Sequence, residues 1–252
     1  MQLDILGSTL PERSFQNTRD NMTIGIIGAG MIGSTLTRRL TELGHEVRVA
    51  NSRAPDTLGE LAEETGATPV WAEEVPKGAD LIIVTIPEAN VPDLPDGLLG
   101  DVPDEVPVVD TGNYYPRERD GRIGPIEEGM PESRWVEQQL GRPVIKAFNN
   151  IYFESLRDNG RPAGADDRIA LPVAGDDPET KAVVCDLIDE LGFDPIDAGG
   201  LDESWRQQPG TPAYTADLDA EGVREALADA SPERPTGFTA TDDSPGTFAD
   251  PA

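Results

Sequence analysis

The fold is decided by residues 23–53, TIGIIGAGMIGSTLTRRLTELGHEVRVANSR. The first five residues, 23–27, are mostly apolar and favour a strand. A G-x-G-x-x-G follows at 28–33, then a helical pattern with Leu36, Leu40 and Leu43 on one face. Gly44 ends that helix and residues 46–50 read as a second strand. A strand, glycine turn, helix and strand within about 30 residues is the context that a dinucleotide-binding fingerprint requires.

Each glycine of this fingerprint has its own expected task. Gly28 lets the chain turn out of the strand, Gly30 lets a pyrophosphate approach the backbone, and Gly33 lets the helix pack close to the sheet. The free N–H groups at the helix start should face the phosphates. The predicted pyrophosphate-binding residues are therefore Gly28, Ala29, Gly30, Met31, Ile32 and Gly33.

The end of the second predicted strand bears on the choice of nucleotide. NAD enzymes usually carry Asp or Glu there, where it bonds the ribose 2′-hydroxyl. This chain has Asn51, Ser52 and Arg53 and no acid. Ser52 can donate a hydrogen bond, and Arg53 can make a forked contact with a 2′-phosphate, although a turn with an exposed arginine would look the same. The pattern favours NADP over NAD.

Composition excludes some classes of partner. The chain has 252 residues and a formal net charge of −28, with 48 acidic against 20 basic residues. This acidity would repel nucleic acid and anionic membranes, so neither is expected as a partner. The carboxylates are spread along the whole chain, which favours a protein from a salt-rich cytoplasm, where screening weakens their repulsion.

The sequence has few residues that could bind a metal ion or form a catalytic triad. Cys185 is the only cysteine, which excludes an internal disulfide and fits a reducing cytoplasm. His45 is the only histidine, so neither a two-histidine metal site nor a Ser-His-Asp triad is expected. No apolar run reaches the ~18 residues that span a bilayer. Residues 1–20 lack the continuous apolar core of a signal peptide.

Further strands are expected to end at the same edge of a parallel sheet. The apolar stretch 80–87 ends in Thr85-Ile86-Pro87, which should border the cofactor because ligands lie beyond the carboxyl ends of strands. Residues 106–111 precede Gly112-Asn113-Tyr114-Tyr115, and residues 143–148 precede Asn149 and Asn150. Both later loops lie at the carboxyl ends of strands and so point to the same crevice, although the asparagine and the two tyrosines at 113–115 could equally pack a loop. The aromatic segment 204–214 could close over the crevice.

The expected architecture is an α/β fold, a Rossmann-type doubly wound parallel sheet with a short α/β C-terminal part. Residues 1–21 read as a disordered extension, and Met22, next to the first strand, is a candidate initiator. Residues 22–150 form the predicted NADP-binding domain and residues 151–217 a small substrate-side part. Residues 218–252 are rich in Ala, Asp, Glu, Pro, Ser and Thr, and we expect a disordered acidic tail with one short helix at 220–228.

Six motifs together resemble one family. IGIIGAGMIG, VANSR, LIIVTIP, VIKAFNNI, LPVAGDD and DAGGLDESWR occur in this order over roughly residues 22–217. The pattern resembles the NADPH-dependent reductases of the deazaflavin coenzyme F(420). The first three motifs are shared with wider NADP-binding relatives, and the LPVAGDD and DAG-L pair is more particular to this family.

The resemblance implies a function and residue roles. It implies hydride transfer between the nicotinamide of NADP and the deazaflavin, stacked in one cleft, and a homodimer. It places the loop 28–33 on the pyrophosphate, Ser52 and Arg53 on the 2′-phosphate, and Thr85, Ile86 and Pro87 beside the ribose and nicotinamide. Ala147, Asn149 and Asn150, within 147–151, would lie under the deazaflavin. No acid–base residue is required, since the cofactors carry the chemistry.

One departure leaves the second substrate open. The family's F(420) reductases usually continue past DAG-L in an apolar helix, whereas this chain has SWRQQPGTPAY and an acidic tail. One alternative is a β-hydroxyacid-type NADP dehydrogenase that uses Lys146 with Asn149 or Asn150, although little chain remains for its helical second domain. Another is a non-catalytic NADP(H)-sensing module, because a fold does not fix a function.

Overall fold

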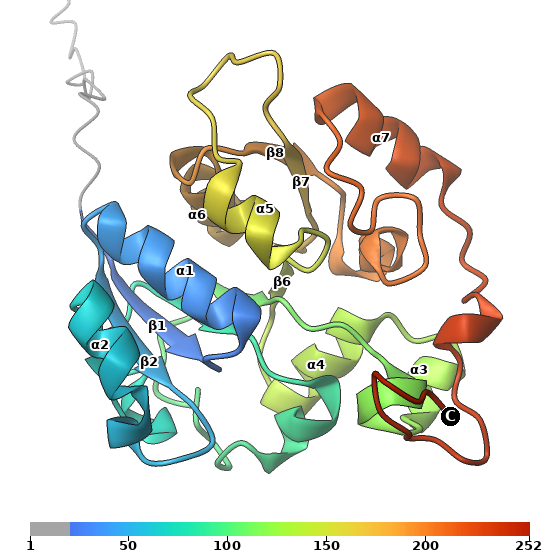
Figure 1. The fold of residues 1–252 in the computed structure, drawn as a ribbon, viewed down its shortest axis with the longest axis horizontal. Coiled ribbons are helices and arrows are strands. Elements are labelled where there is room, and N and C mark those ends of the chain that lie inside the picture. The colour runs from blue at the N-terminus through green and yellow to red at the C-terminus, as the bar shows by residue number, and fades with distance from the viewer. Residues whose placement is uncertain (1–20) are drawn as a thin grey trace, which may run out of the picture.

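A computed structural model describes residues 21–252, so all but the last residue of the predicted extension 1–21 lies outside the described residues. Its centre is a parallel sheet with strand order β3-β2-β1-β4-β5-β6 (Figure 1). The strands are β1 (Thr23–Ile27), β2 (Glu46–Ala50), β3 (Thr68–Pro69), β4 (Leu81–Val84), β5 (Val108–Asp110) and β6 (Ile145–Lys146). The order reverses between β1 and β4, and a parallel sheet places its ligand outside the strand ends at such a switch point.

Helices and short helical turns connect the strands. The α-helices are α1 (Met31–Glu42), α2 (Gly59–Thr65), α3 (Gly124–Glu127), α4 (Glu132–Leu140), α5 (Phe153–Asp158), α6 (Pro178–Glu190) and α7 (Ala220–Asp229). The 3-10 turns are η1 (Pro55–Leu58), η2 (Ala72–Glu74), η3 (Glu88–Asp93), η5 (Leu201–Gln207) and η6 (Thr236–Phe238), and η4 (Pro116–Asp120) is a π turn. Several predicted strands are shortened by one to three residues at their ends.

The central sheet is buried on both faces, as its continuous apolar strands require. Side chains alternate along β4, so that Leu81 and Ile83 enter one core cluster while Ile82 and Val84 enter the other. The first cluster contains Leu36 and Leu40 of α1, and the second lies under the loops at 99–106. The predicted doubly wound α/β sheet is confirmed.

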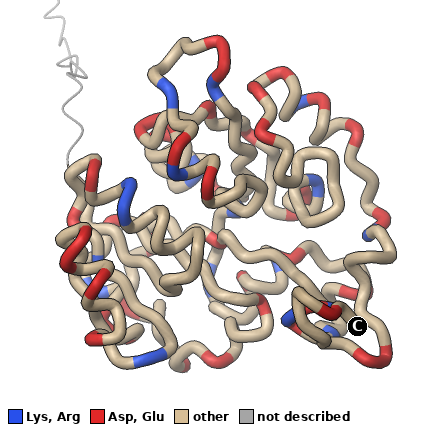
Figure 2. Tube along the Cα trace, in the orientation of Figure 1, with Lys and Arg blue, Asp and Glu red and all other residues tan. Residues whose placement is uncertain are grey.

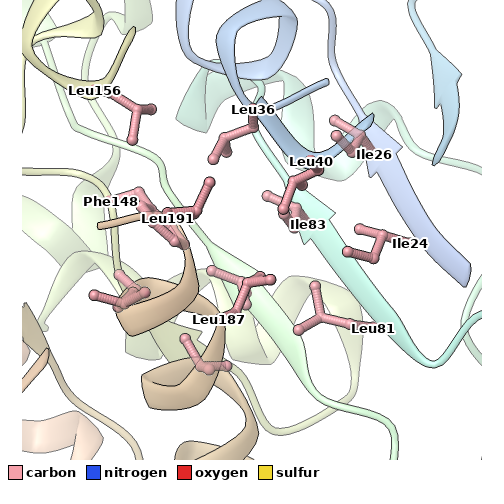
Figure 3. Packing of buried hydrophobic residues seen from close by; sticks show 14 of the residues in the cluster. Ile24, Ile26, Leu36, Leu40, Leu81, Ile83, Phe148, Leu156, Leu187 and Leu191 are labelled. Carbon is pink, nitrogen blue, oxygen red and sulfur yellow. The ribbon is translucent and has the colours of Figure 1, made fainter. Parts of the chain in front are cut away.

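A second, two-stranded sheet continues from the first. β7 (Ala170–Val173) and β8 (Asp194–Asp197) pair in parallel through α6, and Lys146 of β6 bridges to Ala174 at the end of β7. Leu156, Leu187 and Leu191 of this part lie in the same cluster as Leu36 and Ile83 (Figure 3). The C-terminal part thus shares one apolar core with the Rossmann sheet.

The prediction that residues 218–252 are disordered is wrong. α7 packs Val223, Ala226 and Leu227 against Ala170 of β7 and Ile196 of β8. Asp219 caps the helix by accepting a hydrogen bond of 2.8 Å from the Gly222 N–H. The small sheet has an apolar face opposite α6, and a helix with apolar residues at i, i+3 and i+4 covers it. The short helix expected at 220–228 is therefore present, and it is packed against the small sheet.

The chain after α7 crosses to the other half of the molecule. It runs from α7 down to α3, and its end lies beside α3 (Figure 1). The Arg234 guanidinium donates to Glu132 of α4 at 2.8 Å, and Ala240 N–H donates to Glu127 of α3 at 2.9 Å. Residues 231–252 therefore bridge the two halves on the side away from α1 and α2.

Candidate functional site

The glycine loop joins β1 to α1 with little spare room. Gly28 has φ +113°, and a Cβ there would lie 2.2 Å from the Thr85 carbonyl oxygen. A Cβ on Gly33 would lie 2.0 Å from the Gly28 carbonyl oxygen, so the helix can only approach the strand with glycine at this position. A Cβ on Gly30 would meet nothing within 4 Å, because this residue faces open space.

The start of α1 offers free backbone donors to a ligand. Gly30 is its N-cap, no side chain caps it, and its first turn holds no acidic residue. The first N–H groups of a twelve-residue helix therefore point at the space in front of the glycine loop. This arrangement suits a phosphate group.

A groove of about 570 Å³ extends along the carboxyl ends of β1, β2 and β4. Its residues come from the glycine loop, the end of β2, the turn at 71–73 and the segment after β4. They are Ile27, Gly28, Ala29, Gly30, Asn51, Ser52, Arg53, Leu58, Trp71, Ala72, Glu73, Thr85, Ile86, Pro87, Asn90, Asp93, Leu94 and Pro95. Trp71 is exposed and lies where a flat ring could stack on it.

The end of β2 is built as a compact polar turn. The Asn51 side-chain oxygen accepts from the Arg53 backbone N–H at 2.8 Å, and its amide donates to Thr57 at 3.1 Å. Arg53 is exposed and makes no ion pair with any residue in 21–252. Its guanidinium is therefore available to an anion placed in the groove.

The structure brings nine of the fifteen predicted site residues together in this groove. They are Gly28, Ala29, Gly30, Asn51, Ser52, Arg53, Thr85, Ile86 and Pro87. Met31 is 69% exposed at the start of α1, while Ile32 and Gly33 pack towards the core. Ala147, Asn149 and Asn150 are buried and do not line the groove. Their place under a deazaflavin remains a prediction.

Asn149 ties three loops together. Its amide donates to Asn113 at 3.1 Å and to the Gln207 carbonyl at 2.7 Å. Gln207 donates back to the Asn149 side-chain oxygen at 2.9 Å, and Asn113 donates to the Asn149 carbonyl at 2.9 Å. The segment 204–214 is thus held against the loops after β5 and β6. Asn150 donates to the Ala213 carbonyl at 3.4 Å.

A cluster of buried charges lies beneath these loops and was not predicted. The Lys146 ammonium donates to Asp110 at 3.1 Å and to the Gly112 carbonyl at 2.6 Å. Glu88 and Glu132 are also fully buried nearby. Although burial opposes a charge on the ammonium, the three carboxyl groups outweigh it and raise the pKa of Lys146. Burial, with Asp110 close by, raises the pKa of Glu88 well above its ordinary value.

Tyrosines surround the loop after β5. The Tyr115 hydroxyl hydrogen-bonds the Tyr214 hydroxyl, which joins this loop to the segment 204–214. The Arg119 guanidinium lies 5.4 Å from the centre of the Tyr115 ring. Burial raises the pKa of both hydroxyls, so both are neutral donors at physiological pH. The sequence shows Tyr115 as a candidate, but nothing local pairs it with Tyr214, 99 residues away.

No group of residues in the described part of the chain is arranged to hold a metal ion. Among residues 21–252, no helix has the length and apolar character needed to cross a membrane.

The switch-point groove and its glycine loop define a dinucleotide-binding Rossmann domain. Comparison with known proteins gives one family: residues 23–114 match the family described as NADP oxidoreductase, coenzyme F(420)-dependent. This family is one of NAD(P)-dependent oxidoreductases, and the predicted resemblance is confirmed.

Individual relatives cover different parts of the chain. It is 47% identical to protein YjhV of Escherichia coli (strain K12) over 86 residues, which are 34% of this chain and 56% of YjhV. It is 25% identical to the metalloreductase STEAP3 of Rattus norvegicus over 182 residues, 71% of this chain and 34% of STEAP3. The chain thus spans only part of the curated relatives that it matches.

Two crystal structures are similar over most of the chain. Protein SMa0349 of Sinorhizobium meliloti has a TM-score of 0.66 and 28% identity, covering 79% of this chain and 95% of that protein. A proposed F(420)-dependent NADP reductase from Arthrobacter sp. FB24 has a TM-score of 0.57 and 26% identity, covering 72% of this chain and 86% of that protein. The structural similarity therefore extends beyond residues 23–114, which alone could not account for such coverage.

Proposed function

We propose that this chain is an NADP-dependent oxidoreductase that transfers a hydride between NADPH and a second redox cofactor, the deazaflavin coenzyme F(420). One observation carries the choice of NADP. The end of β2 presents Asn51, Ser52 and Arg53 to the groove without an acid, and Arg53 makes no ion pair within residues 21–252. A 2′-phosphate would supply the missing partner, whereas a 2′-hydroxyl would not.

The chain's own residues bind and orient the nucleotide. The N–H groups at the start of α1 hold the pyrophosphate, and the open space at Gly30 lets it approach the backbone. Thr85, Ile86 and Pro87 form the wall beside the ribose and nicotinamide. NADPH, when bound, supplies the hydride from its nicotinamide ring. The protein contributes chiefly by placing donor and acceptor in contact.

Two lines of support favour a deazaflavin as acceptor. The family description names coenzyme F(420), and the Arthrobacter structure is that of a proposed F(420)-dependent NADP reductase. The aromatic side chains Tyr115, Tyr152 and Tyr214 come from the loops at the ends of β5 and β6 and from the segment over them. Aromatic side chains suit the flat rings of a deazaflavin.

The runner-up, a β-hydroxyacid-type dehydrogenase, is less well supported. Such an enzyme would use Lys146 on its substrate, but the Lys146 ammonium is fully buried and donates to Asp110 and the Gly112 carbonyl. The side chain of Asn149, its proposed companion, is engaged by Asn113 and Gln207. A sensing module would bind NADP(H) in the same groove without turning it over. Only a measurement of activity distinguishes such a module from an enzyme.

The test is NADPH oxidation in concentrated KCl, followed by nicotinamide absorbance, with and without oxidised F(420). NADH serves as the control nucleotide, and small hydroxy acids with NADP⁺ test the runner-up. Loss of NADPH only with F(420) would support the proposal. Tight NADPH binding with no turnover on F(420) or any hydroxy acid would refute it in favour of the sensor. We also propose a cytoplasmic location, because the lone Cys185 fits a reducing compartment. The family resemblance leads us to propose a homodimer.

A further inference from the structure

The C-terminal segment 236–252, here called the strap, lies against the acceptor side of the site. It is anchored just before its start, where Arg234 donates to the buried Glu132 and to Gln208. From there it crosses η4 (Pro116–Asp120): the N–H groups of Gly246 and Ala252 donate to the Arg117 carbonyl at 2.6 and 3.2 Å. The strap thus covers the segment that directly follows Tyr115.

Two arginines beneath the strap lack an acidic partner. In a chain with 48 acidic residues, neither Arg117 nor Arg122 has a carboxylate within 4 Å among residues 21–252. Arg117 donates instead to the carbonyls of Thr236 at 2.6 Å and Thr239 at 2.9 Å, and Arg122 to that of Ala240 at 3.4 Å. Basic positions gather beside the chain's end (Figure 2). A guanidinium can form two parallel hydrogen bonds to a carboxylate or phosphate, and the opposite charges attract, so an anionic ligand would compete with these carbonyls.

The strap also covers the Tyr115 ring. The centre of the Phe248 ring lies 5.5 Å from the centre of the Tyr115 ring, in an edge-on arrangement, and the centre of the Phe238 ring lies 6.3 Å from it. Phe248 is itself 63% exposed, so this contact removes little apolar surface from water. The ring of a ligand that stacks on Tyr115 would replace both contacts.

The strap is loosely seated. A cavity of about 510 Å³ lies beneath residues 231–235, the segment that precedes the strap. The Gln208 side chain lines this cavity, and its buried amide nitrogen has no hydrogen-bond partner. The strap's own acidic residues, Asp242, Asp243 and Asp250, make no ion pair with residues 21–252. Besides the bond of 2.9 Å from the Ala240 N–H to Glu127, the strap is held mainly through backbone carbonyls and two partial ring contacts, which favours reversible opening.

We propose that Tyr115, Arg117 and Arg122 form a binding site for an acceptor that has an aromatic ring and an anionic group, and that the strap occupies this site until the acceptor displaces it. This inference rests on the proposed function, because it takes the loop after β5 as the acceptor side. Tyr115 stacks on the ring, and the two guanidinium groups exchange strap carbonyls for the anion. Arg234, paired to Glu132, remains as the hinge.

FMN and riboflavin are suitable probes, because they share one ring system and differ by a phosphate. Their affinities are measured by calorimetry without NADPH, on the full chain and on an Arg117→Gln/Arg122→Gln variant. We expect FMN to bind the unaltered chain about tenfold tighter than riboflavin, and the ratio to fall to about one in the variant. Arg224→Gln is the matched control, because Arg224 lies exposed on α7 without an ion pair among the described residues; it should keep the ratio.

A second variant separates displacement from simple binding. Phe248→Ala weakens the strap without touching the arginines, so both flavins should bind more tightly with their ratio unchanged. Hydrogen exchange of the Gly246 and Ala252 amides should speed up when FMN binds, because displacement of the strap breaks their hydrogen bonds to the Arg117 backbone carbonyl. An unchanged ratio in the arginine variant, failure of either flavin to bind, or unchanged strap exchange would overturn the proposal. NADPH affinity, measured for each variant, reports separately on the proposed function.

Discussion

Replacing Arg53 by alanine should convert the groove from an NADPH site into one that barely distinguishes the two nucleotides. Hydrogen bonds to charged groups contribute roughly 1.5–3 kcal/mol, and exposed ion pairs roughly 0.2–1 kcal/mol. Arg53 is exposed, but the Asn51 side chain orders its backbone by accepting from the Arg53 N–H at 2.8 Å. A loss of about 1.5 kcal/mol, roughly tenfold in Kd, is therefore expected for NADPH. NADH has no 2′-phosphate and should bind as before.

The assay is a titration of the unaltered chain and the variant with NADPH and NADH, followed by nucleotide fluorescence at two KCl concentrations. The matched control is Arg48→Ala: it removes the same charge from β2, the strand that Arg53 follows, but Arg48 does not line the groove and its guanidinium lies 3.4 Å from the Glu46 carboxylate. The effect of Arg53 should shrink at the higher salt, since an exposed contact is screened. Equal losses of NADPH and NADH affinity in the Arg53 variant would refute the assignment to the 2′-phosphate.

Three further predictions test the frame around the groove. Gly33→Ala should prevent folding, since its Cβ would lie 2.0 Å from a loop carbonyl, whereas Gly30→Ala, with nothing within 4 Å, should fold but lose NADPH affinity; circular dichroism and titration would show both. Lys146→Met should cost about 3–5 kcal/mol in chemical denaturation, because it leaves buried carboxylates unpaired. Lys181→Met, which breaks an ion pair to a largely exposed partner, should cost about 0–1 kcal/mol, and similar losses for the two would contradict the burial argument. Glu88→Gln should raise the melting temperature more at pH 8 than at pH 5. The raised pKa means that native Glu88 holds a proton that the unfolded chain releases, so its contribution to stability falls as pH rises above the ordinary range for glutamate; an equal gain at both pH values would contradict it.

The parts that could be predicted from the sequence are those with local causes. The glycine spacing at 28–33 fixes a strand-turn-helix unit, and the apolar run at 80–87 can only be a buried strand. The missing acid at the end of β2 is visible without a structure, because the residues concerned follow that strand directly. These features account for the groove and for most of its predicted residues.

The parts that could not be predicted depend on distant partners. Lys146 entered the dehydrogenase alternative because nothing local reveals that Asp110, 36 residues earlier, lies beside its ammonium. The bonds that tie Asn149 to Gln207 could not be predicted either, because they span 58 residues. The helix at 220–228 was expected and is present as α7, but its packing against β7 and β8 was not, because those strands lie far away in the sequence. In each case the tertiary neighbour, not the local pattern, decides what the side chain does.

The core that joins the two sheets has a consequence for how this chain can diversify. Arg39 of α1 donates to the carbonyls of Arg157 at 2.8 Å and Leu191 at 3.1 Å, at the ends of α5 and α6. With Leu36 and Leu191 in one cluster, neither half retains its core without the other. The C-terminal half cannot be exchanged as an independent module, as it could in an enzyme with a separable substrate domain. Substitutions that leave this shared interior intact are therefore those in exposed segments such as the strap, where Phe248 is 63% exposed.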